Sequence, residues 1–260
     1  MNESFFFRAF HAFARRVRGT VTNVSTPDPV VAITFDDGPD SGFTPKLLAI
    51  LKRREAQATF FMLGESARKH PELVKEVVSG GHAIGNHSWD HPSFPAISRQ
   101  ERRRQIRECA RALAPHGVRL FRPPFGHQTR ETFLDAFLLG YQVVTWSVSS
   151  EDWMGHDGGL TVERVEGETA PGSILLFHDG VGPVSDTHDR SRERTLDVVD
   201  TVLDRLGGRF RFVTVPQLLR HGRPRRVEWN LKGRPEMFNA LREPDGTPWR
   251  YRPAGEEVDR

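Results

Sequence analysis

The sequence predicts an α/β fold in which a parallel sheet or barrel carries polar clusters at the ends of its strands. Three observations predict it. Short apolar runs alternate with amphipathic helical segments about seven times along the chain. The polar clusters directly follow apolar runs, where an α/β barrel carries its active site. The chain has 260 residues, and single α/β barrels commonly reach about 250 residues, so one domain with terminal extensions accounts for the length.

The strands are predicted from short apolar runs that end in glycine, proline or polar residues. The first run, residues 30–35 (VVAITF), ends in Asp-Asp-Gly-Pro, and glycine and proline terminate a strand. Further runs predict strands over residues 58–63, 82–87, 120–121, 141–148, 173–177 and 211–215.

The helices are predicted from apolar residues that recur at three- and four-residue spacing. Residues 44–54 (TPKLLAILKRR) begin with a threonine cap and a proline in the first turn, and their leucines share one face. The other predicted helices are residues 71–79, 98–114, 131–139 and 195–206. Residues 20–29 are interpreted as a linker or an early loop.

The chain divides into a central domain, residues 30–216, with an extension at each end. The N-terminal extension, residues 1–29, holds four apolar residues at helical spacing: Phe6, Phe10, Phe13 and Val17. A helix that packs this face on the domain is favoured, and a basic helix lying in a membrane interface is the alternative. The C-terminal extension, residues 217–260, contains proline, arginine and tryptophan and shows little periodicity.

Composition excludes several classes of protein. The single cysteine, Cys109, excludes an intramolecular disulfide framework and any cysteine-based zinc cluster, so a transition metal would need histidine and carboxylate ligands. The chain contains no run of about 18 apolar residues, so no transmembrane helix is expected. The order of charges at the N-terminus differs from that of a secretory signal peptide. A cytoplasmic location is therefore expected, with peripheral attachment to the inner membrane face left open.

The formal net charge is only +3, and the surplus arginines lie in two patches. We interpret them as a solvated helix face and tail, because no RNA- or DNA-binding signature accompanies them. No nucleic-acid partner is expected, and the oligomeric state is left open. The patches are Arg99, Arg102, Arg103, Arg104, Arg107 and Arg111, and Arg220, Arg223, Arg225 and Arg226.

The first two polar clusters supply carboxylates and histidines. Asp36 and Asp37 end the first strand, and adjacent side chains on an extended chain point apart, so one could bind a metal while the other takes a proton. The same residues also make a good turn. His87 and His91 are four residues apart and would meet on one side of a helical turn. With Asp37 they would form a three-ligand site with an open position, which is the catalytic kind of zinc site.

Three further clusters follow later strands. Arg122 begins the segment Arg-Pro-Pro-Phe-Gly and can orient a carboxylate, in a loop whose backbone N–H groups could face a substrate oxygen. Glu-Asp-Trp at residues 151–153 and His-Asp at residues 178–179 each follow a strand. A histidine at a strand end, held in one tautomer by an aspartate, is a candidate general acid.

The ordered set TFDDGP, HSWDH, RPPFG, EDW and LLFHD resembles the polysaccharide deacetylase family, the NodB-homology domain of carbohydrate esterase family 4. The resemblance extends over about residues 30–216. It implies a distorted (β/α) barrel of about seven strands. It also implies hydrolysis of N- or O-acetyl groups on a glycan with a bound divalent metal. Zinc is the expected ion, with cobalt or another divalent ion as the alternative.

The resemblance also implies a role for each matching residue. Asp36 would be the general base, which Arg122 would position. His178 would be the general acid, which Asp152 would tune. The metal ligands would be Asp37, His87 and His91.

Three residues would contact the substrate: Phe125 through its backbone N–H, and Trp153 and Leu176 as walls of a groove for the acetyl methyl group. The chain departs from the family pattern at Ser149, where many relatives carry an aspartate. It also has Phe125 where a tyrosine is frequent, which matters little if the role belongs to the backbone.

The expected function is hydrolysis of the amide bond of N-acetylglucosamine-containing oligo- or polysaccharides. The alternatives are an O-acetyl esterase acting on an acetylated polysaccharide, and a non-catalytic glycan-binding module on the same scaffold. A site of two histidines and one carboxylate can also hold Fe(II) for oxygen chemistry. The motifs do not discriminate among chitooligosaccharides, peptidoglycan, exopolysaccharide intermediates and acetylated xylan.

Overall fold

The computed structural model describes residues 19–154, 157–180 and 192–229. Within these residues the main sheet has eight strands, all paired in parallel, in the order β6-β5-β4-β3-β2-β8-β7 with β9 beside the start of β2. The predicted α/β barrel of about seven strands is confirmed. The strands are β2 (Val30–Asp36), β3 (Ala58–Met62), β4 (Ala83–Asn86), β5 (Gly117–Phe121), β6 (Gln142–Val143), β7 (Val148–Ser149), β8 (Ile174–His178) and β9 (Arg211–Phe212).

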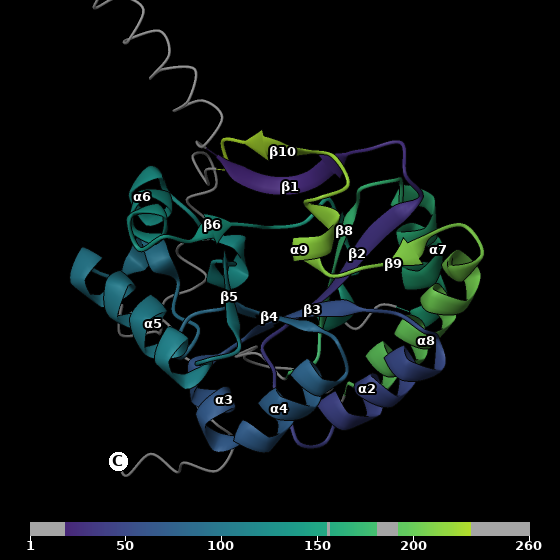
Figure 1. Ribbon diagram of the computed structural model, residues 1–260, viewed down its shortest axis with the longest axis horizontal. Coiled ribbons are helices and arrows are strands. Elements are labelled where there is room, and N and C mark those ends of the chain that lie inside the picture. The colour runs from purple at the N-terminus through teal and green to yellow at the C-terminus, as the bar shows by residue number, and fades with distance from the viewer. Residues whose placement is uncertain (1–18, 155–156, 181–191, 230–260) are drawn as a thin grey trace, which may run out of the picture.

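Helices cover the outside of this curved sheet, with α3, α4, α2 and α8 following one another around it in Figure 1. Helix α8 packs against both α2 and α7 through a face of buried apolar residues. The helices are α2 (Thr44–Arg53), α3 (Gly64–Lys69), α4 (Pro71–Ser79), α5 (Arg99–Ala112), α6 (Arg130–Leu138), α7 (Gly158–Glu168), α8 (Glu193–Gly207) and α9 (Val215–Leu218).

Strand β2 is buried along its whole length because both of its faces are covered. Its outer face packs under the helices through Val31, Ile33 and Phe35. Val30 and Ala32 lie in a second apolar cluster, which includes residues of β8 and α9. Since side chains alternate with a period of two, Thr34 and Asp36 share the face of Val30 and Ala32. That inner face therefore changes from apolar to polar toward the carboxyl end of the strand.

The interpretation of residues 20–29 as a linker or loop is wrong. They contain strand β1 (Thr20–Ser25), which pairs antiparallel with β10 (Arg223–Val227) of the C-terminal extension. In Figure 1 the two strands run side by side across the top of the barrel. The run TVTNVS hides the strand because it has only two apolar side chains, Val21 and Val24, both fully buried. Strand β10 is hidden because its sequence, RPRRV, has a single apolar residue besides its proline.

The predicted single strand over residues 141–148 is wrong as well. It is divided into β6 and β7 because the segment changes partners along its length. The N–H of Val144 donates to Phe121, that of Thr145 to Val21 of β1, and that of Ser147 to Ile174 of β8. Strand β1 also bridges Val144 and Ser173. The segment and β1 thus connect the two edges of the sheet.

The predicted strand over residues 211–215 ends at Phe212. Thr214 begins α9 with a capping box, in which its hydroxyl accepts from the N–H of Gln217 and the Gln217 side chain accepts from the N–H of Thr214. Helices α3 and α7 are also not predicted from the sequence. Helix α3 has six residues, and α7 begins with two glycines.

The arginine patch on α5 is not wholly a solvated face. Arg102 is 8% exposed and, together with Arg99 and Arg103, donates to the buried carboxylate of Asp135 on α6 over 2.9–3.0 Å. The patch therefore helps to pack α5 against α6. No helix among the described residues is long and apolar enough to cross a membrane, and the phenylalanine face of residues 6–17 lies outside them.

Candidate active site

Polar side chains from four strands meet at the carboxyl end of the sheet. Asp36 ends β2 and pairs in register with His178 at the end of β8. His87 directly follows β4, and Arg122 directly follows β5. Because the strands are parallel, their carboxyl ends lie at one edge, so four of the predicted motifs converge there.

Asp37, His87 and His91 form a buried cluster whose three potential ligand atoms all lie within 4.8 Å of one another. Asp37 Oδ1 is 3.2 Å from His91 Nε2 and 3.4 Å from His87 Nε2. His87 Nδ1 lies 2.9 Å from the carbonyl oxygen of Arg122, which can only accept, so Nδ1 carries the proton. His87 Nε2 is therefore the nitrogen that faces Asp37.

The donor atoms of this cluster fit a divalent metal. Asp37 Oδ1 is buried and has no hydrogen-bond partner among the described residues. Burial raises the pKa of Asp37, but its interactions with His91, His87 and His178 lower that pKa well below its usual range. Burial lowers the pKa of His91 to about 3. An ionised carboxylate and neutral imidazoles are the protonation states that a bound metal requires.

The backbone that builds the cluster differs from the expectation. Asp37 is not extended but left-handed, with φ of 77°, so its carboxylate faces the two histidines. Residues 87–91 do not form a helical turn, since Ser88 and His91 are also left-handed, with φ of 77° and 63°. The two imidazole rings nevertheless come together, with centroids 5.0 Å apart. The predicted ligands meet, but through a tight irregular turn.

Arg122 holds the carboxylate of Asp36. Its Nη1 donates to Asp36 Oδ1 over 2.7 Å and to Thr34 Oγ1 over 2.8 Å, and its Nη2 donates to the carbonyl oxygen of Thr145 over 2.8 Å. The guanidinium carbon lies 4.0 Å from the ring centroid of Phe61, and the side chain is fully buried. The other oxygen of Asp36, Oδ2, is 3.7 Å from His87 Nε2. One oxygen is thus fixed while the other faces the histidine cluster.

His178 is paired with Asp152. Its Nδ1 lies 2.8 Å from Asp152 Oδ1, and its backbone N–H donates to Asp152 Oδ2 over 3.1 Å. Burial lowers the pKa of His178, but the charge and hydrogen bond of Asp152 raise it more, so the pKa lies above its ordinary value. Ser150 and Thr195 donate to the same carboxylate. This arrangement favours the doubly protonated imidazolium, which is the form that a general acid needs.

The remaining predicted site residues lie around this centre. Phe125 is left-handed, with φ of 58°, and its ring contacts His91 at a centroid distance of 4.3 Å. Trp153 packs edge-on against His178 at 4.9 Å. Leu176 is buried in β8 and pairs in register with Ser149, the residue at the atypical position.

The C-terminal extension reaches the loop that carries Phe125. Trp229 Nε1 donates to the carbonyl oxygen of Gly126 over 2.8 Å, and its ring packs edge-on against Trp146 at 5.4 Å. A side chain at Gly126 would meet Trp146, because an added Cβ atom would lie 2.7 Å from that ring. Trp146 and Trp229 therefore hold the loop from outside the five motifs.

The contact of Asp179 with Thr44 beside the site is not predicted from the sequence. Asp179 follows His178, but its carboxylate accepts a hydrogen bond from Thr44 over 2.6 Å, and its pKa is raised to about 7 by burial and by Asp37. Thr44 does not cap α2; the residue before the helix is Phe43, which makes no side-chain cap. The position of Asp179 after a predicted acid was the available signal, but the sequence alone does not say which aspartate His178 binds.

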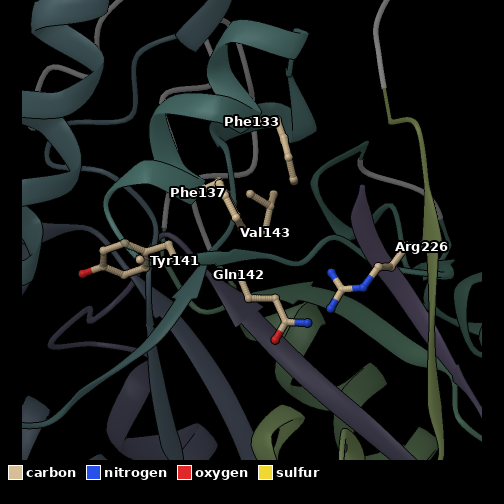
Figure 2. Close-up of a pocket in the computed structure, with 7 residues that line it drawn as sticks. Phe133, Phe137, Tyr141, Gln142, Val143 and Arg226 are labelled. Atoms are coloured by element: carbon tan, nitrogen blue, oxygen red, sulfur yellow. The ribbon is translucent and has the colours of Figure 1, made fainter. Parts of the chain in front are cut away.

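A separate cavity of about 430 Å³ lies at the start of β6, away from these carboxyl ends. Figure 2 shows Arg226 of β10 pointing toward it from the side opposite Phe133 and Phe137 of α6. It shares no lining residue with the aspartate and histidine cluster. The candidate catalytic centre is therefore not this cavity.

Comparisons with known proteins agree with the motifs. Residues 23–144 match the family model described as polysaccharide deacetylase. A peptidoglycan-N-acetylglucosamine deacetylase of Bacillus cereus is 36% identical over 200 residues, which are 75% of this chain and 70% of that protein. A chitooligosaccharide deacetylase of Sinorhizobium fredii is 34% identical over 76% of this chain and 95% of its own. The crystal structure of the peptidoglycan N-acetylglucosamine deacetylase Bc1960 superposes with a TM-score of 0.70 at 34% identity, covering 78% of this chain and 94% of that one.

Proposed function

Because this chain belongs to the polysaccharide deacetylase family, we propose that it removes N-acetyl groups from a glycan that contains N-acetylglucosamine. The reaction is hydrolysis of an amide bond, with acetate and a free amine as products. The observation that carries the proposal is the buried cluster of Asp37, His87 and His91 beside the carboxylate of Asp36. Peptidoglycan and chitooligosaccharides are the substrate classes for which the similar proteins are named.

Asp37, His87 and His91 would hold the metal, and zinc suits two imidazoles and one carboxylate. When bound, the metal would lower the pKa of a water molecule and polarise the acetyl carbonyl. The ionised state of Asp37 and the neutral state of His91 support this assignment. Cobalt or another divalent ion remains the alternative.

Asp36 is proposed as the general base. Arg122 fixes its Oδ1, so Oδ2 is the oxygen placed to take the proton from the attacking water. The backbone N–H of Phe125 would donate to the oxygen that becomes negative in the tetrahedral intermediate. The left-handed backbone at Phe125 supports this role, because non-glycine residues held in that region cluster at functional sites.

His178 is proposed as the general acid. An amine is a poor leaving group unless it is protonated, so N-deacetylation needs a proton donor at the scissile nitrogen. Asp152 holds Nδ1, which leaves Nε2 as the atom that would deliver the proton. Trp153 and Leu176 would form dry walls around the acetyl methyl group, which would disfavour longer acyl chains.

The raised pKa of His178 keeps its imidazole available as a proton donor. That supports amide over ester hydrolysis, because an amine leaving group depends on protonation more than an alcohol does. The non-catalytic module is disfavoured, because Asp36, Arg122, Asp152 and His178 make the contacts that catalysis needs. Fe(II) chemistry has no supporting observation beyond the ligand types. The cytoplasmic location and a peripheral membrane contact stay predictions.

The test is acetate release from N-acetylchitotetraose and from peptidoglycan fragments. The protein is assayed after chelation and again after one equivalent of zinc is restored. We expect no release from the chelated protein and recovery with zinc. Release that is equal with and without metal would contradict the proposal, as would a zinc-loaded protein that binds both glycans and releases no acetate.

A further inference from the structure

The turn that joins the two proposed histidine ligands is stabilised mainly by side chains. Ser88 and His91 both have left-handed backbones, and a non-glycine residue in that strained region persists only where the surrounding structure holds it. The turn is therefore not the conformation that this segment would adopt by itself. Something must fix it if His91 is to face His87 and Asp37.

Four consecutive backbone N–H groups in this turn, those of residues 88–91, donate to side chains. The N–H of Ser88 donates to Asn86 Oδ1 over 3.0 Å, and that of His91 donates to Ser88 Oγ over 3.1 Å. These two acceptors belong to the same segment. The two N–H groups between them, those of Trp89 and Asp90, depend on a different element.

Gln105 of α5 accepts both of these hydrogen bonds. Its Oε1 lies 2.8 Å from the nitrogen of Trp89 and 3.2 Å from that of Asp90. Its Nε2 donates to Asp90 Oδ1 over 2.6 Å and to Glu101 Oε1 over 3.1 Å. The side chain is fully buried, with an exposed fraction of 0%. One glutamine thus pairs with the backbone and the side chain of the turn at the same time.

We propose that Gln105 is a positioning residue that fixes the Ser88–His91 turn and thereby sets the metal affinity of the site. The inference rests on the metal site of the proposed function. Without Gln105 the half-buried N–H groups of Trp89 and Asp90 lose their acceptor, and the turn relaxes toward an ordinary backbone conformation. His91 Nε2 would then no longer be held 3.2 Å from Asp37 Oδ1. Partners that orient metal ligands typically change metal affinity by about 10–100-fold.

The test compares Gln105→Met and Gln105→Glu. Methionine has a similar length and shape but accepts no comparable hydrogen bond. Glutamate keeps an oxygen that can accept from Trp89 and Asp90, but its carboxylate replaces the amide donor and would face the carboxylates of Asp90 and Glu101. The control is Gln217→Met in α9, which removes a glutamine that makes a 2.7 Å hydrogen bond to Gln57 and a 2.7 Å bond from the N–H of Thr214. This control separates loss of a half-buried glutamine network elsewhere in the protein from loss of the network at the turn.

The readouts are the dissociation constant for zinc, by competition with a chelator, and the visible absorption spectrum of the cobalt-substituted protein. Urea unfolding of the metal-free proteins shows that each variant is folded. We expect zinc affinity to fall about 10–100-fold in Gln105→Met, with a changed cobalt spectrum. We expect at least as large a loss in Gln105→Glu, because its carboxylate would be repelled by those of Asp90 and Glu101. We expect wild-type affinity in Gln217→Met.

Wild-type zinc affinity and cobalt spectrum in Gln105→Met would overturn the inference. Wild-type zinc affinity in Gln105→Glu would overturn it as well, because repulsion from Asp90 and Glu101 should displace the turn. Both results can be told apart from failure of the proposed function, because the metal is measured without substrate. If the wild-type protein bound no metal, the proposed function itself would fail.

Discussion

Replacing Arg122 by methionine is expected to lower the free energy of unfolding of the metal-free protein by about 3–5 kcal/mol. Arg122 is fully buried, and its charge neutralises Asp36, of which 3% is exposed. Without the guanidinium, the carboxylate stays buried with no cation beside it, and the carbonyl oxygen of Thr145 loses its 2.8 Å hydrogen bond. Removal of one member of a buried pair is costly because the other charge is left unpaired.

The assay is urea unfolding at neutral pH of wild type, Arg122→Met, Asp36→Asn and the double variant. The double variant should lose at least about 1 kcal/mol less than the sum of the single losses, because it leaves no unpaired charge. Arg102→Met is the control: it removes another buried arginine, bound to Asp135 over 2.9 Å, and should keep acetate release. Single losses below about 1 kcal/mol, or losses that add within about 0.5 kcal/mol, would refute the reasoning.

Three further predictions follow from the same contacts. Burial lowers the pKa of His178 and Asp152 raises it more, so kcat should fall as pH rises through that pKa. Asp152→Asn should move this alkaline limb of the pH profile to lower pH. A limb that does not move would contradict the assignment of His178 as the acid. Trp229→Phe removes the hydrogen bond to Gly126 and keeps a ring against Trp146. The free energy of unfolding should fall by about 1 kcal/mol, and kcat should fall while zinc affinity stays unchanged. A kcat equal to that of the wild type would show that the loop does not need this contact. Zinc at 100 times its dissociation constant should stabilise the folded protein by about 3 kcal/mol over the chelated form, and Asp37→Ala should abolish that gain in a thermal unfolding assay.

The residues that meet at the candidate site could be predicted from the sequence because each motif follows a strand. Asp36, His87, Arg122 and His178 converge because parallel strands bring their carboxyl ends to one edge. The backbone that presents them could not be predicted. The spacing of His87 and His91 suits a helix, and only the left-handed residues of the structure show the turn that joins them.

Long-range hydrogen bonds account for most of what the sequence does not show. Gln105 lies in an arginine-rich helix 14 positions after His91, and nothing in its spacing connects it to the turn. Strand β1 has few apolar residues, and its pairing with β10 joins segments about 200 residues apart. Local hydrophobic patterns in the sequence do not identify partners that lie so far apart, because the pairing depends on the curvature of the whole sheet.

The measurement that tests the account most directly is the comparison of metal content with acetate release in Asp36→Asn and Asp37→Ala. Different roles are proposed for these adjacent carboxylates, of which one is held by Arg122 and the other faces the two histidines. Asp36→Asn should bind one zinc ion per chain and release no acetate, and Asp37→Ala should lose both zinc and activity. Turnover in Asp36→Asn, or wild-type zinc affinity in Asp37→Ala, would contradict it.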